Sequence, residues 1–183
     1  MDSKLTMYKQ YIGYYNTNLL WGNQELLGLS QYNYPKISPD ITPVIPLKKY
    51  RLGHLVEQFV FHELEQLTSV KILATNCQIK SHKRTIGELD CLLLDENSPI
   101  HLEIIYKFYL YDESVGYSEL EHWIGPNRKD SLIEKITKLK QKQFPLLHHP
   151  ETQELLKELG LNILDIEQQV LFKAQLFVPY KLL

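Results

Sequence analysis

Four charged residues interrupt apolar runs in the middle of the chain. Glu88 and Asp90 stand at the start of the run GELDCLLL, and Glu103 and Lys107 interrupt the run HLEIIYKFYL. Ionised side chains are rarely buried unless they are paired or bound to a metal. Carboxylate oxygens are hard ligands that suit Mg²⁺ or Mn²⁺, and a nearby lysine can orient or deprotonate an attacking water. These residue types therefore suit metal-dependent hydrolysis of a phosphodiester.

The acids fall on two predicted strands, residues 86–94 and 100–111, which are separated by the polar turn DENSP. Alternate residues of a strand share a face, so Asp90 and Glu103 converge if the strands pair as a hairpin. Two adjacent carboxylates repel each other, which raises a pKa or requires a cation. The alternative is that Glu103 and Lys107 form an ion pair on an edge strand, while Asp90 is solvated.

The rest of the chain supplies elements to position these residues. Helical periodicity predicts helices over 4–16, 50–68, 128–143 and 151–159, and strand patterns also cover 70–80 and 168–178. This order predicts an α/β domain with a mixed central sheet flanked by helices. Prolines between residues 30 and 47 predict an extended loop, so that residues 1–49 form a helical and extended arm packed on a domain of residues 50–183.

The composition and net charge limit which classes of binding partner the protein can have. The net charge of −2 gives no overall attraction to nucleic acid, so any such contact requires a local patch. No apolar stretch approaches the ~20 residues needed to span a bilayer, and the N-terminus lacks a signal-peptide core. We therefore expect a cytoplasmic protein with no membrane partner.

A candidate nucleic-acid site follows the third strand. Trp123, Asn127, Arg128 and Lys129 lie in a loop that leads into the predicted helix, with Asn127 as its expected cap. A helix N-terminus favours phosphate, and Trp123 could stack on a base. The alternative is a capped helix whose tryptophan covers the core.

The helix itself is basic. Residues 128–142 hold six basic residues against two acidic ones, and Lys135, Lys138 and Lys142 can share one stripe. Such a stripe could follow a phosphate backbone, although an ordinary solvated helix face has the same pattern.

The helix over 50–68 carries Glu57 beside its apolar stripe. A solvated glutamate is the ordinary expectation there. The alternative is a carboxylate that reaches over the sheet towards Asp90.

The predicted order αβββαβ resembles the restriction-endonuclease-like core of the PD-(D/E)XK nuclease superfamily, and GELD at 87–90 resembles the motif around its first acid. The resemblance implies Mg²⁺ or Mn²⁺ held by Asp90 and Glu103, with Glu88 as a further candidate ligand and Glu57 as an assisting acid. The superfamily places its lysine two residues after the second acid, where this chain has Ile105. Lys107 would have to take over, although its Cα lies ~13 Å from that of Glu103 in a regular strand.

More closely, four segments resemble an uncharacterised bacterial family, domain of unknown function 1853, which is placed in that superfamily. The segments are LGHLVEQF, GELDCLL, HLEIIYKFYL and WIGPNRKDSL, within a resemblance that runs from about Trp21 to Tyr180. It implies a metal-dependent nuclease acting on DNA or RNA. The alternatives are a catalytically inactive nuclease-fold module that binds nucleic acid or a protein partner, and an assembly protein with solvated acids.

Overall fold

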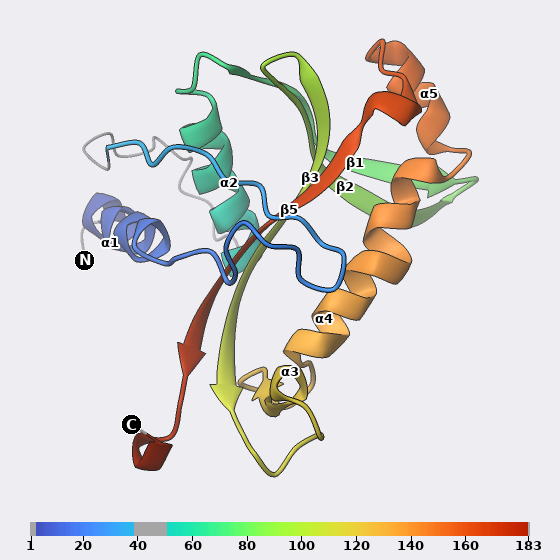
Figure 1. Ribbon diagram of the computed structural model, residues 1–183. Coiled ribbons are helices and arrows are strands. Elements are labelled where there is room, and N and C mark those ends of the chain that lie inside the picture. Colours follow the sequence, from blue (N-terminus) through green and yellow to red (C-terminus); the bar gives the residue numbers. More distant parts are fainter. Residues whose placement is uncertain (1–2, 39–50, 183) are drawn as a thin grey trace.

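A mixed sheet with helices on both faces forms the centre of the protein (Figure 1). The computed structural model describes residues 3–38 and 51–182. Within them, β1 to β4 pair in order through antiparallel ladders, and β5 pairs with β3 in parallel. The strands are β1 (Val70–Ser81), β2 (Arg84–Asp95), β3 (Ser98–Tyr111), β4 (Trp123–Ile124) and β5 (Glu167–Phe177). The predicted mixed sheet flanked by helices is confirmed.

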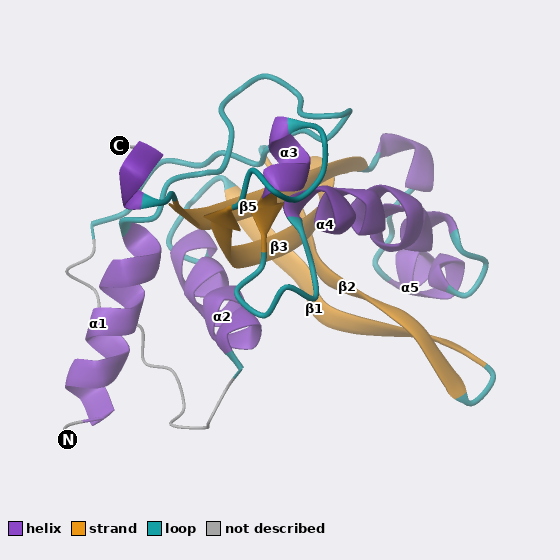
Figure 2. Cartoon of the chain, turned by 90° about the horizontal axis from the view of Figure 1, so that it is seen from below, coloured by secondary structure: helices purple, strands orange, loops and turns teal. Residues whose placement is uncertain are grey.

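The helices divide between the two faces of the sheet. Helices α1 and α2 pack on one face, and α4 with the turns that continue it packs on the other (Figures 1 and 2). The α-helices are α1 (Ser3–Tyr15), α2 (Leu52–Leu64), α3 (Glu119–His122), α4 (Leu132–Lys138) and α5 (Thr152–Glu158). A π-helical turn, η1 (Leu139–Gln143), and a 3-10 turn, η2 (Phe144–His148), prolong α4; two further 3-10 turns are η3 (Ile163–Asp165) and η4 (Tyr180–Leu182).

Strand β3 sends alternate residues to the two faces, as the period of a strand requires. Leu102 and Ile104 pack with α1 and α2, whereas Ile105 and Tyr109 pack with α4. Glu103 belongs to the second set. Its carboxylate is therefore directed towards the α4 side of the sheet.

The segment after α1 covers the outer edge of β5. The backbone N–H of Leu20 donates to the carbonyl of Phe172, and Val170 exchanges backbone hydrogen bonds with Ser30 and Tyr32. These bonds satisfy an edge that would otherwise be open to pairing with another chain. Residues 39–49 of the predicted arm lie outside the described residues, and the domain boundary near residue 50 stays a prediction.

The predicted helix over 128–143 begins later than expected. Ser131 caps it, because the Ser131 hydroxyl accepts a 3.3 Å hydrogen bond from the N–H of Glu134. The prediction that Asn127 caps the helix is wrong. Asn127 lies in a turn before the helix, which is closed by a 2.7 Å hydrogen bond from the N–H of Gly125 to the C=O of Asp130. The loop expected there also contains α3 and β4. Among residues 3–38 and 51–182, no helix is both long and apolar enough to cross a membrane.

Candidate active site at the fork between β2 and β3

Strands β2 and β3 part at the level of two acidic residues. Their ladder ends with Cys91 opposite Leu102, and Asp90 and Glu103 occupy the next position in that register. Beyond it, β2 continues with β1 as a two-stranded ribbon, while β3 continues with β5 (Figure 2). The Asp90 carboxylate accepts a 2.8 Å hydrogen bond from the backbone N–H of Ile104. The side chain of Asp90 thus satisfies an amide at the point where the two strands separate.

Glu103 is fully buried and hydrogen bonded through both oxygens. Oε1 lies 3.1 Å from Nε2 of His101, and Oε2 accepts a bond from the side-chain amide of Gln143. The other ring nitrogen of His101 lies 2.9 Å from the amide nitrogen of Gln168, which can only donate. Nε2 of His101 therefore carries the proton and donates a hydrogen bond to Glu103. Burial lowers the pKa of His101 to about 4, so the ring is neutral near pH 7.

Burial raises the pKa of both acids. For Asp90, the charge of Glu103 adds to the effect of burial, and the pKa reaches about 7. For Glu103, burial raises the pKa to about 7 against the opposing charge of Lys135. Two such groups titrate as a pair. Near neutral pH they either retain a proton or need a cation that lets both ionise.

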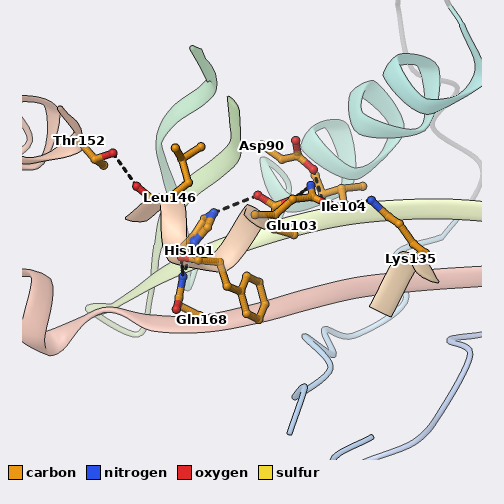
Figure 3. Close-up of polar contacts among 10 residues, drawn as sticks. Asp90, His101, Glu103, Ile104, Lys135, Leu146, Thr152 and Gln168 are labelled. Carbon is orange, nitrogen blue, oxygen red and sulfur yellow. Dashed lines mark hydrogen bonds and ion pairs between the residues drawn. The ribbon is translucent and has the colours of Figure 1, made fainter. Parts of the chain in front are cut away.

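Lys135 of α4 brings a positive charge to this pair. Its ammonium donates a 2.8 Å hydrogen bond to Oε1 of Gln143, whose amide nitrogen donates to Glu103. Figure 3 shows the side chain reaching from the helix towards the strand that carries Glu103. Burial lowers the pKa of Lys135 to about 8, while the charges of Glu103 and Asp90 oppose that shift. Lys135 is therefore part of the acidic site.

Glu57 lies over the sheet and not in solvent. It is buried, accepts a 2.8 Å bond from the amide of Asn76, and lies 3.1 Å from Nδ1 of His54. Its charge raises the pKa of both Asp90 and Glu103. Asn76 stands opposite Asp90 in the register of β1 and β2 and has a left-handed φ of 50°, which is uncommon outside glycine. The expectation of a solvated Glu57 is wrong, and the alternative of a glutamate over the sheet holds.

Glu88 is further from the pair. It lies opposite Gln78 of β1 and is half-buried. Its charge raises the pKa of Glu103, but within the described residues it makes no hydrogen bond to either acid.

Lys107 has a different partner. Its ammonium lies 2.6 Å from Oδ2 of Asp130 in an ion pair open to solvent. Ile105, where the superfamily resemblance implies a lysine, is buried against Tyr109 and α4. Lys107 is therefore paired with Asp130, and the lysine hydrogen bonded into the acid site is Lys135. The catalytic role predicted for Lys107 stays a prediction.

The residues predicted to contact nucleic acid differ in their exposure and in their partners. The ring of Trp123 packs on Tyr111, with ring centroids 5.0 Å apart, so the tryptophan covers the core edge. The Arg128 guanidinium lies 2.6 Å from Asp112, which neutralises it, whereas Asn127 and Lys129 are exposed.

The predicted basic stripe is also divided. Lys138 and Lys142 are exposed, but Lys135 turns inward. The prediction that the three lysines share one stripe is wrong, because Lys135 lies three residues after Leu132 and four before Leu139, on the buried face of the helix.

Four polar residues that complete the site were not predicted as site residues: His101, Gln143, Gln168 and Asn76. His101 could have been found, because it stands two residues before Glu103 on the same strand face. Gln143 could have been found as well, because it continues the inward face of α4 one turn beyond Leu139. Gln168 and Asn76 have no such signal, since their positions depend on the pairing of other strands.

Asp90 and Glu103 are the residues of this site that could hold a Mg²⁺ or Mn²⁺ ion. Mg²⁺ is commonly held by one or two carboxylates, with waters and substrate phosphates completing its shell. Among the described residues, no group of three or more His, Cys, Asp or Glu side chains is arranged to hold a metal. Among the described residues, the Asp90 carboxylate accepts its hydrogen bond through Oδ2, from the N–H of Ile104.

The fold and the site define an α/β protein with a pair of carboxyl groups, Glu103 buried and Asp90 partly buried, at a fork in its mixed sheet. The family model described as a domain of unknown function (DUF1853) matches residues 39–182. The chain belongs to this family, which confirms the closer of the two resemblances found in its sequence. No curated protein and no solved structure matches the chain.

Proposed function

We propose that this protein is a metal-dependent nuclease that hydrolyses phosphodiester bonds in DNA or RNA. The observation that carries the proposal is the acid pair Asp90 and Glu103 at the strand fork, with the ammonium of Lys135 linked to it through Gln143. The order α2, β1, β2, β3, α4, β5 supports it, because the PD-(D/E)XK resemblance implies that order.

Asp90 and Glu103 would hold Mg²⁺ or Mn²⁺ between the separating strands. When bound, such an ion polarises a phosphoryl oxygen and lowers the pKa of water. His101 fixes one oxygen of Glu103, and Ile104 fixes one oxygen of Asp90, so both carboxylates are oriented in advance. Glu57 adds negative charge beside the pair and strengthens its attraction for a cation.

Lys135 is the residue to which we assign the role predicted for Lys107. An ammonium beside the acid pair can stabilise charge that develops on a phosphoryl group. Its pKa of about 8 also allows it to exchange a proton with an attacking water near neutral pH. Lys107 has a less suitable position, because Asp130 neutralises it.

A second candidate function is a catalytically inactive module of the same fold that binds nucleic acid or a protein partner. Two observations favour it: both oxygens of Glu103 already have protein partners, and Ile105 occupies the place of the expected lysine. This function predicts binding that does not depend on metal and that weakens when an exposed lysine such as Lys138 is changed to glutamate.

The test is a pair of measurements on the wild type, Asp90→Asn and the exposed-acid control Asp165→Asn. We expect calorimetry to show Mn²⁺ binding that only Asp90→Asn loses. We also expect metal-dependent cleavage of DNA or RNA to be lost with it. Equal Mn²⁺ binding by all three proteins, without cleavage of any nucleic acid, would refute the nuclease proposal.

A further inference from the structure

A cavity lies between the N-terminal segment and β5. Its volume is about 440 Å³, within the usual range for small-molecule sites of roughly 300–1,000 Å³. Glu63 of α2 and Lys173 of β5 line it, together with residues of the segment that covers the edge of β5. It therefore belongs to the α2 side of the sheet, whereas the acid pair faces α4.

Lys173 is a buried cation with few partners. Its ammonium has three donors, but it makes one 3.4 Å hydrogen bond, to the carbonyl of Tyr14, and lies 4.0 Å from the centre of the Tyr14 ring. Among the described residues, no carboxylate lies within ion-pair distance of it. Lysine is almost never buried without a partner, so this ammonium can still take an anion from the cavity.

The acid in the same cavity is already satisfied. Both oxygens of Glu63 accept hydrogen bonds from tyrosine hydroxyls, one from Tyr11 at 3.0 Å and two from Tyr14 and Tyr34. Three donors on one carboxylate leave it little capacity for a further ligand. The negative charge of Glu63 thus partly balances the positive charge of Lys173, but Glu63 does not accept a hydrogen bond from the Lys173 ammonium.

The other residues that line the cavity suit a ligand that has a hydrogen-bond acceptor and a flat apolar body. The indole N–H of Trp21 is buried and has no acceptor among the described residues. Lys36 adds a second positive charge at the cavity. The walls are aromatic and aliphatic, with Tyr15, Tyr32 and Leu19 among them. Aromatic walls with a few polar groups that fix orientation are typical of ligand sites.

We propose that this cavity binds a small organic acid, whose carboxylate or phosphate pairs with Lys173 and whose ring-sized body lies among the aromatic walls. The site is independent of the proposed nuclease activity. Charge-assisted hydrogen bonds from an ammonium to an oxyanion are roughly twice as strong as neutral ones, so the acid group provides the selectivity.

The test uses Trp21 as a reporter. The chain has two tryptophans, so Trp123→Phe leaves Trp21 as the only indole and makes its emission specific to the cavity. Benzoate and phenyl phosphate are the anionic probes, and benzamide is the neutral probe of the same shape. We expect a saturable change in emission with the anions and binding at least about tenfold weaker with benzamide, a difference of about 1.4 kcal/mol.

Lys173→Met removes the charge and keeps the length of the side chain, and Lys157→Met, on the exposed side of α5, is its matched control. We expect only Lys173→Met to weaken benzoate binding, by about tenfold or more. If Lys173→Met does not fold, the comparison of benzoate with benzamide decides the question. The proposal is overturned if neither anion gives a saturable change at millimolar concentration, if benzamide binds as well as benzoate, or if folded Lys173→Met binds as tightly as its control.

Discussion

Lys135 and Glu103 are joined through one side-chain amide. Lys135 donates a 2.8 Å hydrogen bond to the oxygen of Gln143, and the nitrogen of Gln143 donates to Glu103. The link connects α4 and its π-helical continuation to β3, so the long helix and the acidic fork form one unit. A π-helical turn inside a helix is rare and is found frequently at functional sites.

The first prediction separates the two candidate lysines. We expect Lys135→Met to lower kcat/KM for metal-dependent cleavage by about 100-fold or more, as removal of one group that stabilises transition-state charge does. We expect Lys107→Met to lower it by less than about tenfold, because Lys107 is paired with Asp130. The measurement is the initial rate of cleavage at saturating Mg²⁺.

Lys138→Met is the matched control for Lys135→Met, since Lys138 lies one turn further along α4 and is exposed. It should weaken substrate binding at most, without a change in kcat. Loss of activity in Lys107→Met together with full activity in Lys135→Met would show that the role had been assigned to the wrong lysine.

The second prediction concerns pH and stability. The folded-state pKa of Asp90 is raised from 3.8 to about 7, so the folded protein binds a proton more tightly than the unfolded chain does. The free energy of unfolding therefore falls as pH rises from about 4 to 7. Asp90→Asn removes this titration and retains an acceptor for the N–H of Ile104. We expect its stability relative to the wild type to increase between pH 5 and pH 8 by more than about 1.4 kcal/mol, which corresponds to a tenfold change in proton affinity.

Urea denaturation at the two pH values gives this difference, and Asp165→Asn supplies the baseline for loss of an exposed acid. Mg²⁺ should raise the stability of the wild type at pH 8 and leave Asp90→Asn unchanged, because a ligand that binds only the folded state stabilises it by mass action. A pH-independent difference between Asp90→Asn and the wild type would contradict the raised pKa.

The third prediction concerns the contact between α1 and α2. Glu63 accepts hydrogen bonds from Tyr11, Tyr14 and Tyr34, which ties the N-terminal segment to the core. Glu63→Gln places an NH₂ group against hydroxyls that donate, and we expect it to lower the free energy of unfolding by about 1–3 kcal/mol. Glu65→Gln, at an exposed position directly after α2, should change the free energy of unfolding by less than about 0.5 kcal/mol. Equal effects in a denaturation series would mean that the buried tyrosine cluster does not hold the segment.

Much of the fold could be predicted from local patterns. β1, β2, β3 and β5 lie within about two residues of their predicted bounds, because period-two burial and polar turns are properties of short stretches. The end of a helix was harder to place, as Ser131 and Asn127 illustrate. Both residue types can cap a helix, and only the turn between Gly125 and Asp130 selects Ser131.

The candidate site was predictable where its residues follow the local periodicity of a strand or helix. Asp90 and Glu103 share a face because of strand periodicity, and their pairing follows from the short turn between the strands. Lys107 shares that face too, but the turn between Gly125 and Asp130 places the Asp130 carboxylate beside it. A strand pattern gives the face of a side chain but not the partner that it meets there.

The sequence by itself determined the order of the main helices and strands, apart from α3 and β4, the face on which the two acids lie and the family to which the chain belongs. Only the tertiary structure decided which lysine meets the acids and that His101, Gln143 and Gln168 hold Glu103 in place. The physical reason is that periodicity is a local property of the backbone, whereas hydrogen-bond partners depend on the register and packing of segments tens of residues apart.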